Sequence, residues 1–158
     1  MGRYVVWSDI PNNRQLRWIE DDNRVTEFRN PSGHSNGNTF DREGRQLSCE
    51  HSGRRVARYE YNGDVTVIAE SFDGKQLNSP NDVVVHPDGG IWFTDPPYGL
   101  EGMNDSPLKE QDANGVYRLS PDGEITRLID TMTFPNGIVL SPDSQTLYVS
   151  QSDPDQPV

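Results

Sequence analysis

The segment SPNDVVVHPDGGIWFTDPPYG, residues 79–99, decides the fold. It reads as a polar turn, a short apolar strand, a tight Gly-rich turn, a second apolar strand and a rigid Pro-Pro exit. Asn81 and Asp95 stand at the two ends of this predicted hairpin, where strands meet loops. β-Scaffolds usually carry their chemistry at such places. The pattern therefore predicts a hairpin that presents polar groups at one end.

The same unit recurs on both sides of this segment. Three stretches align without gaps: NGNTFDREG at 36–44, NDVVVHPDG at 81–89 and NGIVLSPDS at 136–144. Each is followed by a second predicted strand and then, where the chain continues, by another hairpin with a turn such as Asn62-Gly63. Four short strands repeated at a period of about 45 residues are typical of a β-propeller.

The repeat predicts an all-β fold of about three propeller blades. We expect a partial blade over residues 1–30, a blade over 31–75, a blade over 76–130 with a loop insertion at 99–113, and the start of another over 131–158. Propellers close with four to eight blades, so we expect the chain to be a piece of a longer propeller. An independent three-blade protein is the alternative, and it would leave edge strands unpaired.

Composition narrows the class of function. A formal charge of −11 argues against nucleic acid or an anionic membrane as partner, and it is compatible with a cation site. The single cysteine, Cys49, excludes an internal disulfide and a multi-thiolate zinc site, and its neighbours predict a buried structural thiol. Residues 1–10 show no signal-peptide pattern and no stretch is apolar over a membrane's thickness, so we expect a cytoplasmic location.

The asparagines that head the repeated hairpins are the first candidate site. Asn36, Asn81 and Asn136 occupy equivalent places, and a propeller brings equivalent loop ends together around its axis. An amide oxygen can ligate a hard cation or orient a substrate oxygen. For Asn36 we favour the alternative that Asn before Gly adopts a left-handed turn. For Asn81 and Asn136, each preceded by proline, we favour the site.

Acidic residues close the second strand of several units, at Asp9, Glu50 and Asp95. A carboxylate there can be a ligand or a general base, or it can cap loop amides. Asp95, followed by two prolines, is the strongest of the three. Glu50 with His51 comes second, and we interpret His51 as a polar rim residue.

Two further patterns are interpreted as structural. Ser35 lies in a G-x-S-x-G match, but a predicted strand follows where a nucleophile elbow needs a helix, so Ser35 is excluded as a nucleophile. Aromatic residues recur at strand positions and are predicted to be core: Trp7, Trp18, Trp92, Phe93 and Tyr148.

Taken together, FPNG at 134–137, SPND at 79–82 and WFTDPPYG at 92–99 resemble the SMP-30/gluconolactonase/LRE-like family, and CEH at 49–51 fits its gluconolactonase branch. The resemblance implies a six-bladed β-propeller that hydrolyses sugar lactones with a divalent cation. Ca²⁺ is the expected ion, with Zn²⁺ or Mg²⁺ as alternatives.

The resemblance also implies roles for individual residues. Asn136 matches a metal ligand, Asn81 matches a residue near both metal and substrate, and Asp95 matches a position that some relatives place near the metal. The metal-binding Glu would lie before Gly2, and the general-base Asp beyond Val158. Ser79 stands where sugar-lactonase relatives carry an arginine that helps hold the sugar.

These assignments predict metal-assisted hydrolysis of a small-molecule lactone, with a carboxylate activating water. With part of the ligand set outside it, the chain alone is expected to be inactive. The identity of the lactone and the oligomeric state stay open. So do two other classes of function, a non-catalytic propeller that binds partners and a calcium-binding regulatory protein, because fold alone does not separate them.

Overall fold

The computed structural model describes residues 3–153, which are almost entirely β-strand and turn. Two short 3-10 helices interrupt the strands, η1 (Ile10–Asn12) and η2 (Met103–Asp105). The strands are β1 (Tyr4–Asp9), β2 (Arg14–Ile19), β3 (Arg24–Arg29), β4 (Ser35–Phe40), β5 (Gln46–Glu50), β6 (Arg55–Tyr59), β7 (Val65–Ala69), β8 (Ser71–Phe72), β9 (Lys75–Gln76), β10 (Val83–Val85), β11 (Ile91–Asp95), β12 (Gly115–Leu119), β13 (Ile125–Ile129), β14 (Pro135–Leu140) and β15 (Leu147–Gln151).

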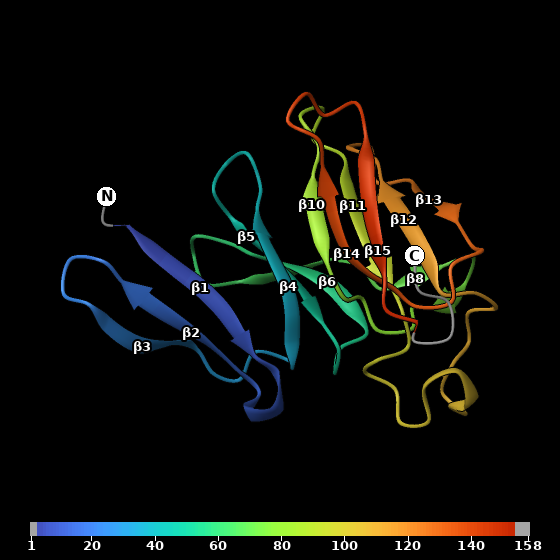
Figure 1. Ribbon diagram of the computed structural model, residues 1–158, viewed down its shortest axis with the longest axis horizontal. Helices are drawn as coiled ribbons and strands as arrows, with labels where there is room; N and C mark the ends of the chain where they lie inside the picture. The colour runs from blue at the N-terminus through green and yellow to red at the C-terminus, as the bar shows by residue number, and fades with distance from the viewer. Residues whose placement is uncertain (1–2, 154–158) are drawn as a thin grey trace.

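The strands form successive antiparallel sheets, each made from one continuous piece of chain. Their orders are β1-β2-β3, β4-β5-β6-β7, β10-β11-β12-β13 and β14-β15, with β8-β9 as a small separate hairpin. Figure 1 shows the sheets following one another across the molecule, from blue to red. The predicted all-β partial propeller is confirmed. The four main sheets fall within the four expected units, of which residues 1–2 and 154–158 lie outside the described part.

The first strands of successive units lie side by side, β4 beside β10 and β10 beside β14. At the β4–β10 junction the Gly37 amide donates to the carbonyl oxygen of Asn81 at 2.7 Å. A Cβ on Gly37 would overlap the Asp82 carboxylate and lie 2.6 Å from the Asp82 Cα. The left-handed turn predicted at Asn36 is therefore wrong. Both Asn36 and Gly37 lie in β4 without a positive φ, and glycine is required there by close approach.

The core lies between the second and third sheets. Leu47, Cys49 and Val56 from the second sheet pack with Phe93 and Tyr117 from the third, and all five are fully buried. The Phe93 and Tyr117 rings stack with centroids 5.3 Å apart. Burial raises the pKa of the Cys49 thiol well above its usual value. The chain thus buries its single cysteine as a small apolar side chain, as predicted.

The aromatic predictions hold in the middle of the chain and fail at its flanks. Phe93 is fully buried, and Trp18 and Trp92 are half-buried. Trp7 on β1 is 38% exposed and Tyr148 on β15 is 57% exposed, so their prediction as core residues is wrong. The reason is position, because the first and last sheets of the described chain each pack against one neighbouring sheet and leave the other face open.

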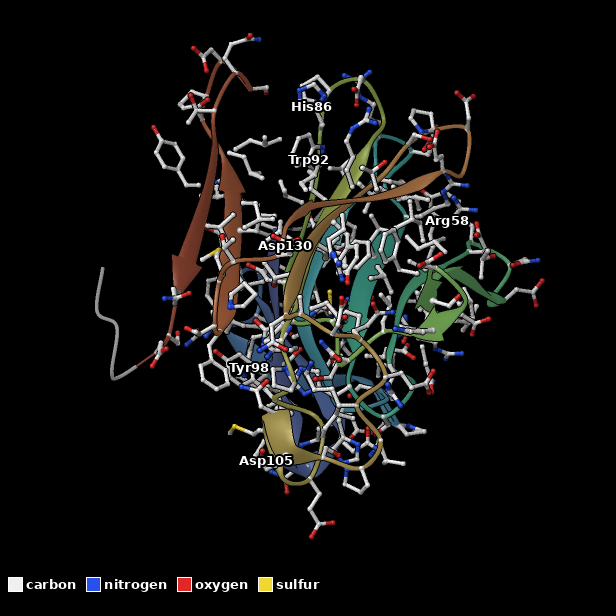
Figure 2. The ribbon with its side chains drawn as sticks, turned by 90° about the vertical axis from the view of Figure 1, so that its right-hand side faces the viewer. Arg58, His86, Trp92, Tyr98, Asp105 and Asp130 are labelled. Atoms are coloured by element: carbon white, nitrogen blue, oxygen red, sulfur yellow. The ribbon has the colours of Figure 1, made fainter. Side chains whose placement is uncertain are left out.

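The strands define two ends of the molecule. Asn36, Asn81 and Asn136 mark one end, which we call the asparagine end, and the tight turns between the first two strands of each unit mark the other, the turn end. Tyr98 and His86 lie toward opposite ends of Figure 2. Among residues 3–153 no helix has the length and apolarity needed to cross a bilayer.

Candidate functional site

Asn81 and Asn136 are held around one residue at the asparagine end. The Asn81 amide donates to the backbone carbonyl of Thr94 at 2.9 Å. The hydroxyl of the same Thr94 donates to the backbone carbonyl of Asn136 at 2.6 Å. Because Thr94 ends the second strand of the third unit and Asn136 opens the fourth, a single buried threonine ties the two asparagines together across a sheet junction.

The side chains of the two asparagines make few hydrogen bonds within the described part of the chain. Asn81 is only 3% exposed, yet no hydrogen bond joins its side chain to another residue between 3 and 153. Asn136 donates from Nδ2 to the Ser152 hydroxyl at 2.9 Å, which fixes the amide plane and leaves Oδ1 unused by that bond. Neither amide belongs to the buried side-chain atoms that lack a partner, so both groups keep contact with the surface and have bonding capacity that a ligand can use.

A carboxylate that the repeat alignment passed over lies between these asparagines. Asp82 occupies the position that Gly37 and Gly137 hold in the neighbouring units. Its Oδ1 accepts the Val83 amide at 2.9 Å, and its Oδ2 accepts the Ile138 amide of the next unit at 3.0 Å. Burial raises the pKa of Asp82, and these two backbone bonds partly offset that rise. The sequence signal for this bridge was an aspartate at a repeat position where the other two units have glycine.

Asp95 is placed differently from the asparagines. Its carboxylate is fully buried, with Oδ2 accepting the Asn78 backbone amide at 2.8 Å. Burial raises its pKa to about 7 in spite of bonds from the backbone of Asn78 and Ser79. This geometry is that of a cap on loop amides. The substrate-binding role expected for Asp95 stays a prediction, because no part of its side chain reaches the surface.

The other acids at strand exits are engaged with basic or phenolic partners. Glu50 is buried, with Arg55 donating to it at 2.7 Å and the Tyr59 hydroxyl donating to its other oxygen. Asp9 accepts from Arg14 at 2.8 Å, and this bond is the main cause of its lowered pKa. These carboxylates are already neutralised within their own units.

Two buried serines at this end, Ser35 and Ser79, also have structural roles. Ser35 is buried in β4, 3.0 Å from the hydroxyl of Ser8, which agrees with its exclusion as a nucleophile. Ser79 is fully buried, donates to the Pro96 carbonyl at 2.7 Å and accepts the Gly99 amide at 2.8 Å. The position of the expected sugar-binding arginine is therefore used here to hold the loop that follows β11.

A cavity of about 330 Å³ opens at the asparagine end. We call it the imidazole pocket, and it is lined by Ile10, His34, His51, Ser52, Tyr98 and Gly99. The sequence interpretation of His51 as a rim residue needs correction, because it is only 8% exposed. Burial, and then the neighbouring His34, lowers the pKa of His51 to about 4.

Tyr98 connects this pocket to Asn136. Its ring stacks on Phe134 with centroids 5.9 Å apart, and its hydroxyl donates to the Phe134 carbonyl at 3.3 Å. Burial raises the pKa of Tyr98, and hydrogen bonds with the side chains of Ser152 and Asn136 oppose that rise. The pocket wall therefore contacts Phe134, two residues before the candidate ligand residue.

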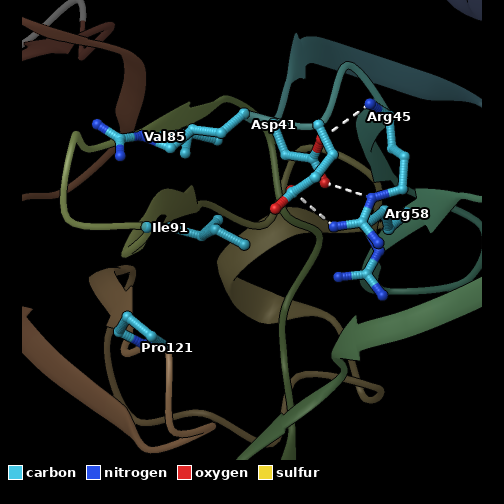
Figure 3. A pocket seen from close by; sticks show the side chains of 9 residues that line it. Asp41, Arg45, Arg58, Val85, Ile91 and Pro121 are labelled. Atoms are coloured by element: carbon cyan, nitrogen blue, oxygen red, sulfur yellow. Dashed lines mark hydrogen bonds and ion pairs between the residues drawn. The ribbon is translucent and has the colours of Figure 1, made fainter.

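A second cavity, of about 250 Å³, lies at the turn end and is lined by charged residues (Figure 3). Arg45 donates to Asp41 at 2.7 Å and to Glu43 at 2.8 Å. Arg58 is bound to Glu60 at 2.7 Å. Since Arg45 and Arg58 are already held by carboxylates, most of the charge around this cavity is satisfied within the protein.

The described residues fit a hard cation in kind but not in number. Residues 3–153 hold no cluster of three or more His, Cys, Asp or Glu side chains able to bind a metal. What they bring near one another are the amide side chains of Asn81 and Asn136 and the carboxylate of Asp82, whose two oxygens each accept a backbone amide. Such oxygens suit Ca²⁺ or Mg²⁺ better than Zn²⁺, which prefers nitrogen and sulfur. A calcium ion takes six to eight oxygens, so most ligands would come from elsewhere or from water.

Comparison with known proteins matches these features to one group. A family model described as SMP-30/Gluconolactonase/LRE-like region matches residues 1–156. A gluconolactonase from Zymomonas mobilis is 36% identical over 166 residues, covering 96% of this chain and 46% of that protein. The solved structure of a gluconolactonase from Xanthomonas campestris is 41% identical with a TM-score of 0.84, covering 95% of this chain and 50% of that one.

A more distant structure shares the fold alone. Regucalcin from Agrobacterium tumefaciens, described as a calcium-binding protein, superimposes with a TM-score of 0.67 at 21% identity, over 94% of this chain and 46% of that one. The chain thus spans about half the length of the relatives that it matches from end to end.

Proposed function

The chain belongs to the SMP-30/gluconolactonase/LRE-like family, and from this membership we propose that the whole protein carrying it hydrolyses a small sugar lactone. The sequence resemblance to this family is thereby confirmed. Support for the activity comes from gluconolactonase relatives at 36% and 41% identity. The observation that carries the proposal is that Asn81 and Asn136 are held around Thr94, the Asn81 side chain without a hydrogen bond among residues 3–153 and the Asn136 side chain bonded there through Nδ2.

We propose that Asn136 and Asn81 hold a divalent cation, with Ca²⁺ preferred because both donors are neutral oxygens. When bound, such a cation supplies electrophilic stabilisation of the oxyanion that forms as water attacks the lactone carbonyl. Asn136 is oriented for this role by its bond to Ser152, and Asn81 by its backbone bond to Thr94. We propose that Asn81 also contacts the substrate carbonyl.

The group that activates water is proposed to lie outside residues 3–153. Asp95 is fully enclosed, so its carboxylate cannot take a proton from a surface water, and both oxygens of Asp82 already hold backbone amides of the fold. A cytoplasmic location and the absence of nucleic-acid or membrane partners stay predictions, which cell fractionation and binding assays can check.

The test is hydrolysis of D-glucono-1,5-lactone by the full-length protein, followed by acid release at constant pH. We expect turnover that EDTA abolishes and added Ca²⁺ restores. Asn136→Ala should lower kcat/KM on the order of 100-fold, and Asn81→Ala by at least tenfold, because each removes a ligand to the cation or substrate. Asn36→Ala is the matched control, since it removes the same side chain from the equivalent place in the second unit.

Each outcome bears on a different part of the proposal. A protein that hydrolyses no lactone would overturn it, and calcium-dependent melting without turnover would favour the regulatory alternative instead. Turnover that is insensitive to chelators would support the proposed hydrolase activity and contradict the proposed role of the cation. Equal losses in all three asparagine variants would mean that these residues serve the fold rather than the site.

A further inference from the structure

The imidazole pocket is assembled from three successive units. Ile10 comes from the loop after β1, His34 and His51 from the second unit, and Tyr98 and Gly99 from the loop after β11. Its volume of about 330 Å³ is near the lower end of small-molecule sites, which span roughly 300–1,000 Å³. The pocket is therefore large enough for a compact ligand. Its wall forms only when the three units are correctly packed.

The pocket is built tightly against the candidate site. The Tyr98 hydroxyl donates to the backbone carbonyl of Phe134, two residues before Asn136. Gly99 lies against His51 of the second unit and Ser79 of its own unit, because a Cβ on Gly99 would come within 2.7 Å of the His51 Cβ and 2.8 Å of the Ser79 Cβ. Ser79 is two residues before Asn81 and fixes this loop through both of its hydroxyl bonds. The pocket therefore contacts the two short segments that lead into Asn81 and Asn136.

The lining is polar but carries no permanent charge. No Asp, Glu, Lys or Arg is among the lining residues, in contrast to the cavity at the turn end. The His34 Nδ1 pairs with the Ser52 hydroxyl at 2.6 Å. Of the two nitrogens of His51, Nε2 is enclosed without a partner, while Nδ1 makes no hydrogen bond within residues 3–153 and is left for the pocket.

We propose that the imidazole pocket binds the hydroxyl groups of a neutral, polyhydroxylated ring lactone, and that His51 and His34 determine specificity for them. A neutral imidazole donates from one nitrogen and accepts at the other, as a sugar hydroxyl requires of its partner. Because burial keeps the pKa of His51 at about 4, its ring stays neutral near pH 7. This inference rests on the proposed function and adds the part of the substrate that is recognised.

The test compares two lactones in the full-length protein. D-Glucono-1,5-lactone carries ring hydroxyls, and δ-valerolactone has the same ring without them. His51→Gln places the carboxamide carbon, which makes no hydrogen bond, near where Nδ1 stood, and it should raise KM for the sugar lactone about tenfold with kcat little changed, the effect of one lost hydrogen bond. Kinetics on δ-valerolactone should not change. His51→Asn, which returns a polar atom near Nδ1, should recover most of the loss.

A second variant and a control guard against misfolding. His34→Asn removes the other imidazole, and asparagine tolerates the left-handed backbone of this residue, whose φ is +50°. It should raise KM for the sugar lactone alone. His86→Gln removes a histidine at the turn end and should leave both lactones unaffected. An unchanged KM in both pocket variants, or equal losses of kcat/KM on both lactones, would overturn the proposal.

Failure of the pocket can be told apart from failure of the proposed function. Glucono-1,5-lactam is a stable analogue whose binding can be measured by calorimetry without any turnover. Binding by the wild-type protein that weakens about tenfold in His51→Gln would support the pocket even if no lactone were hydrolysed. Absence of lactam binding by a protein that does hydrolyse the sugar lactone would overturn the pocket and leave the activity standing.

Discussion

Asp95 shows how a single carboxyl group can make the fold sensitive to pH. It is fully buried at the end of β11, and Oδ2 accepts the Asn78 amide while Oδ1 has no partner among the described residues. Burial raises its pKa from 3.8 to about 7. Between these two values the folded state holds a proton that the unfolded state releases, so the free energy of unfolding falls as pH rises.

Replacing Asp95 by Asn should remove this dependence. Between pH 4 and 7 the wild-type protein should lose stability relative to Asp95→Asn by up to about 1.4 kcal/mol per pH unit, the linkage of one proton. Urea unfolding at several pH values measures the difference. Asp143→Asn is the control, because the Ser141 hydroxyl lowers the pKa of Asp143 and places its titration below this window. Parallel curves for wild type and Asp95→Asn would contradict the prediction.

The strands β1, β5 and β11 are equivalent in the repeat, and hydroxyl groups near the ends of β1 and β11 join one unit to the next. The Ser8 hydroxyl at the end of β1 donates to the Asn36 carbonyl at 2.7 Å, as Thr94 does to Asn136. Cys49 occupies the equivalent place in β5, and there the Gly37 amide takes over by donating to Asn81. At each of the three junctions, the backbone carbonyl of the asparagine that begins the next unit accepts a hydrogen bond. The donor is a side-chain hydroxyl for Asn36 and Asn136 and a backbone amide for Asn81.

Thr94→Val tests this junction, since it keeps the shape of the side chain and removes its hydroxyl. The change leaves the Asp82 amide and the Asn136 carbonyl without the Thr94 hydroxyl as partner, at 3.2 Å and 2.6 Å in the native fold. We expect a loss of about 2 kcal/mol in the free energy of unfolding, measured by urea titration. Thr126→Val, on an exposed position of β13, should cost little. Equal effects of the two changes would show that the hydroxyl bond does not join the units.

The molecule as a whole has a well-packed middle and open flanks. Tyr4, Val5 and Trp7 are exposed on β1, and Val139 and Tyr148 are exposed on the last sheet. Large apolar side chains gathered in this way mark surfaces that pack against something else. In a family of propellers about twice this length, we expect further blades to cover both flanks.

Residues 1–158 on their own should therefore hydrolyse sugar lactones poorly. Two amide oxygens are few ligands for a calcium ion, and the open flanks should also promote association between copies. Assays of the isolated chain beside the full-length protein, with and without EDTA, check this. Chelator-sensitive turnover by the isolated chain at the full-length rate would show that the site is complete without further blades.

The repeat made the architecture predictable, and local contacts decided what could not be predicted. The alignment of Asn36, Asn81 and Asn136 was enough to place the first strands together, because equivalent positions in a propeller are related by rotation. It could not show that Asp82 bridges two units, since its partner, the Ile138 amide, is 56 residues away in sequence. Nor could it place His51 in a pocket, which depends on a loop from another unit resting on it.

The enclosed Cys49 gives the protein a built-in reporter. It is the single thiol of the chain and belongs to the core shared by the second and third sheets, beside Val83 and Phe93. A thiol reagent can reach it only when that core separates, and its raised pKa suppresses reaction further. The labelling rate of the native protein therefore counts how often those two sheets part, without any engineered probe.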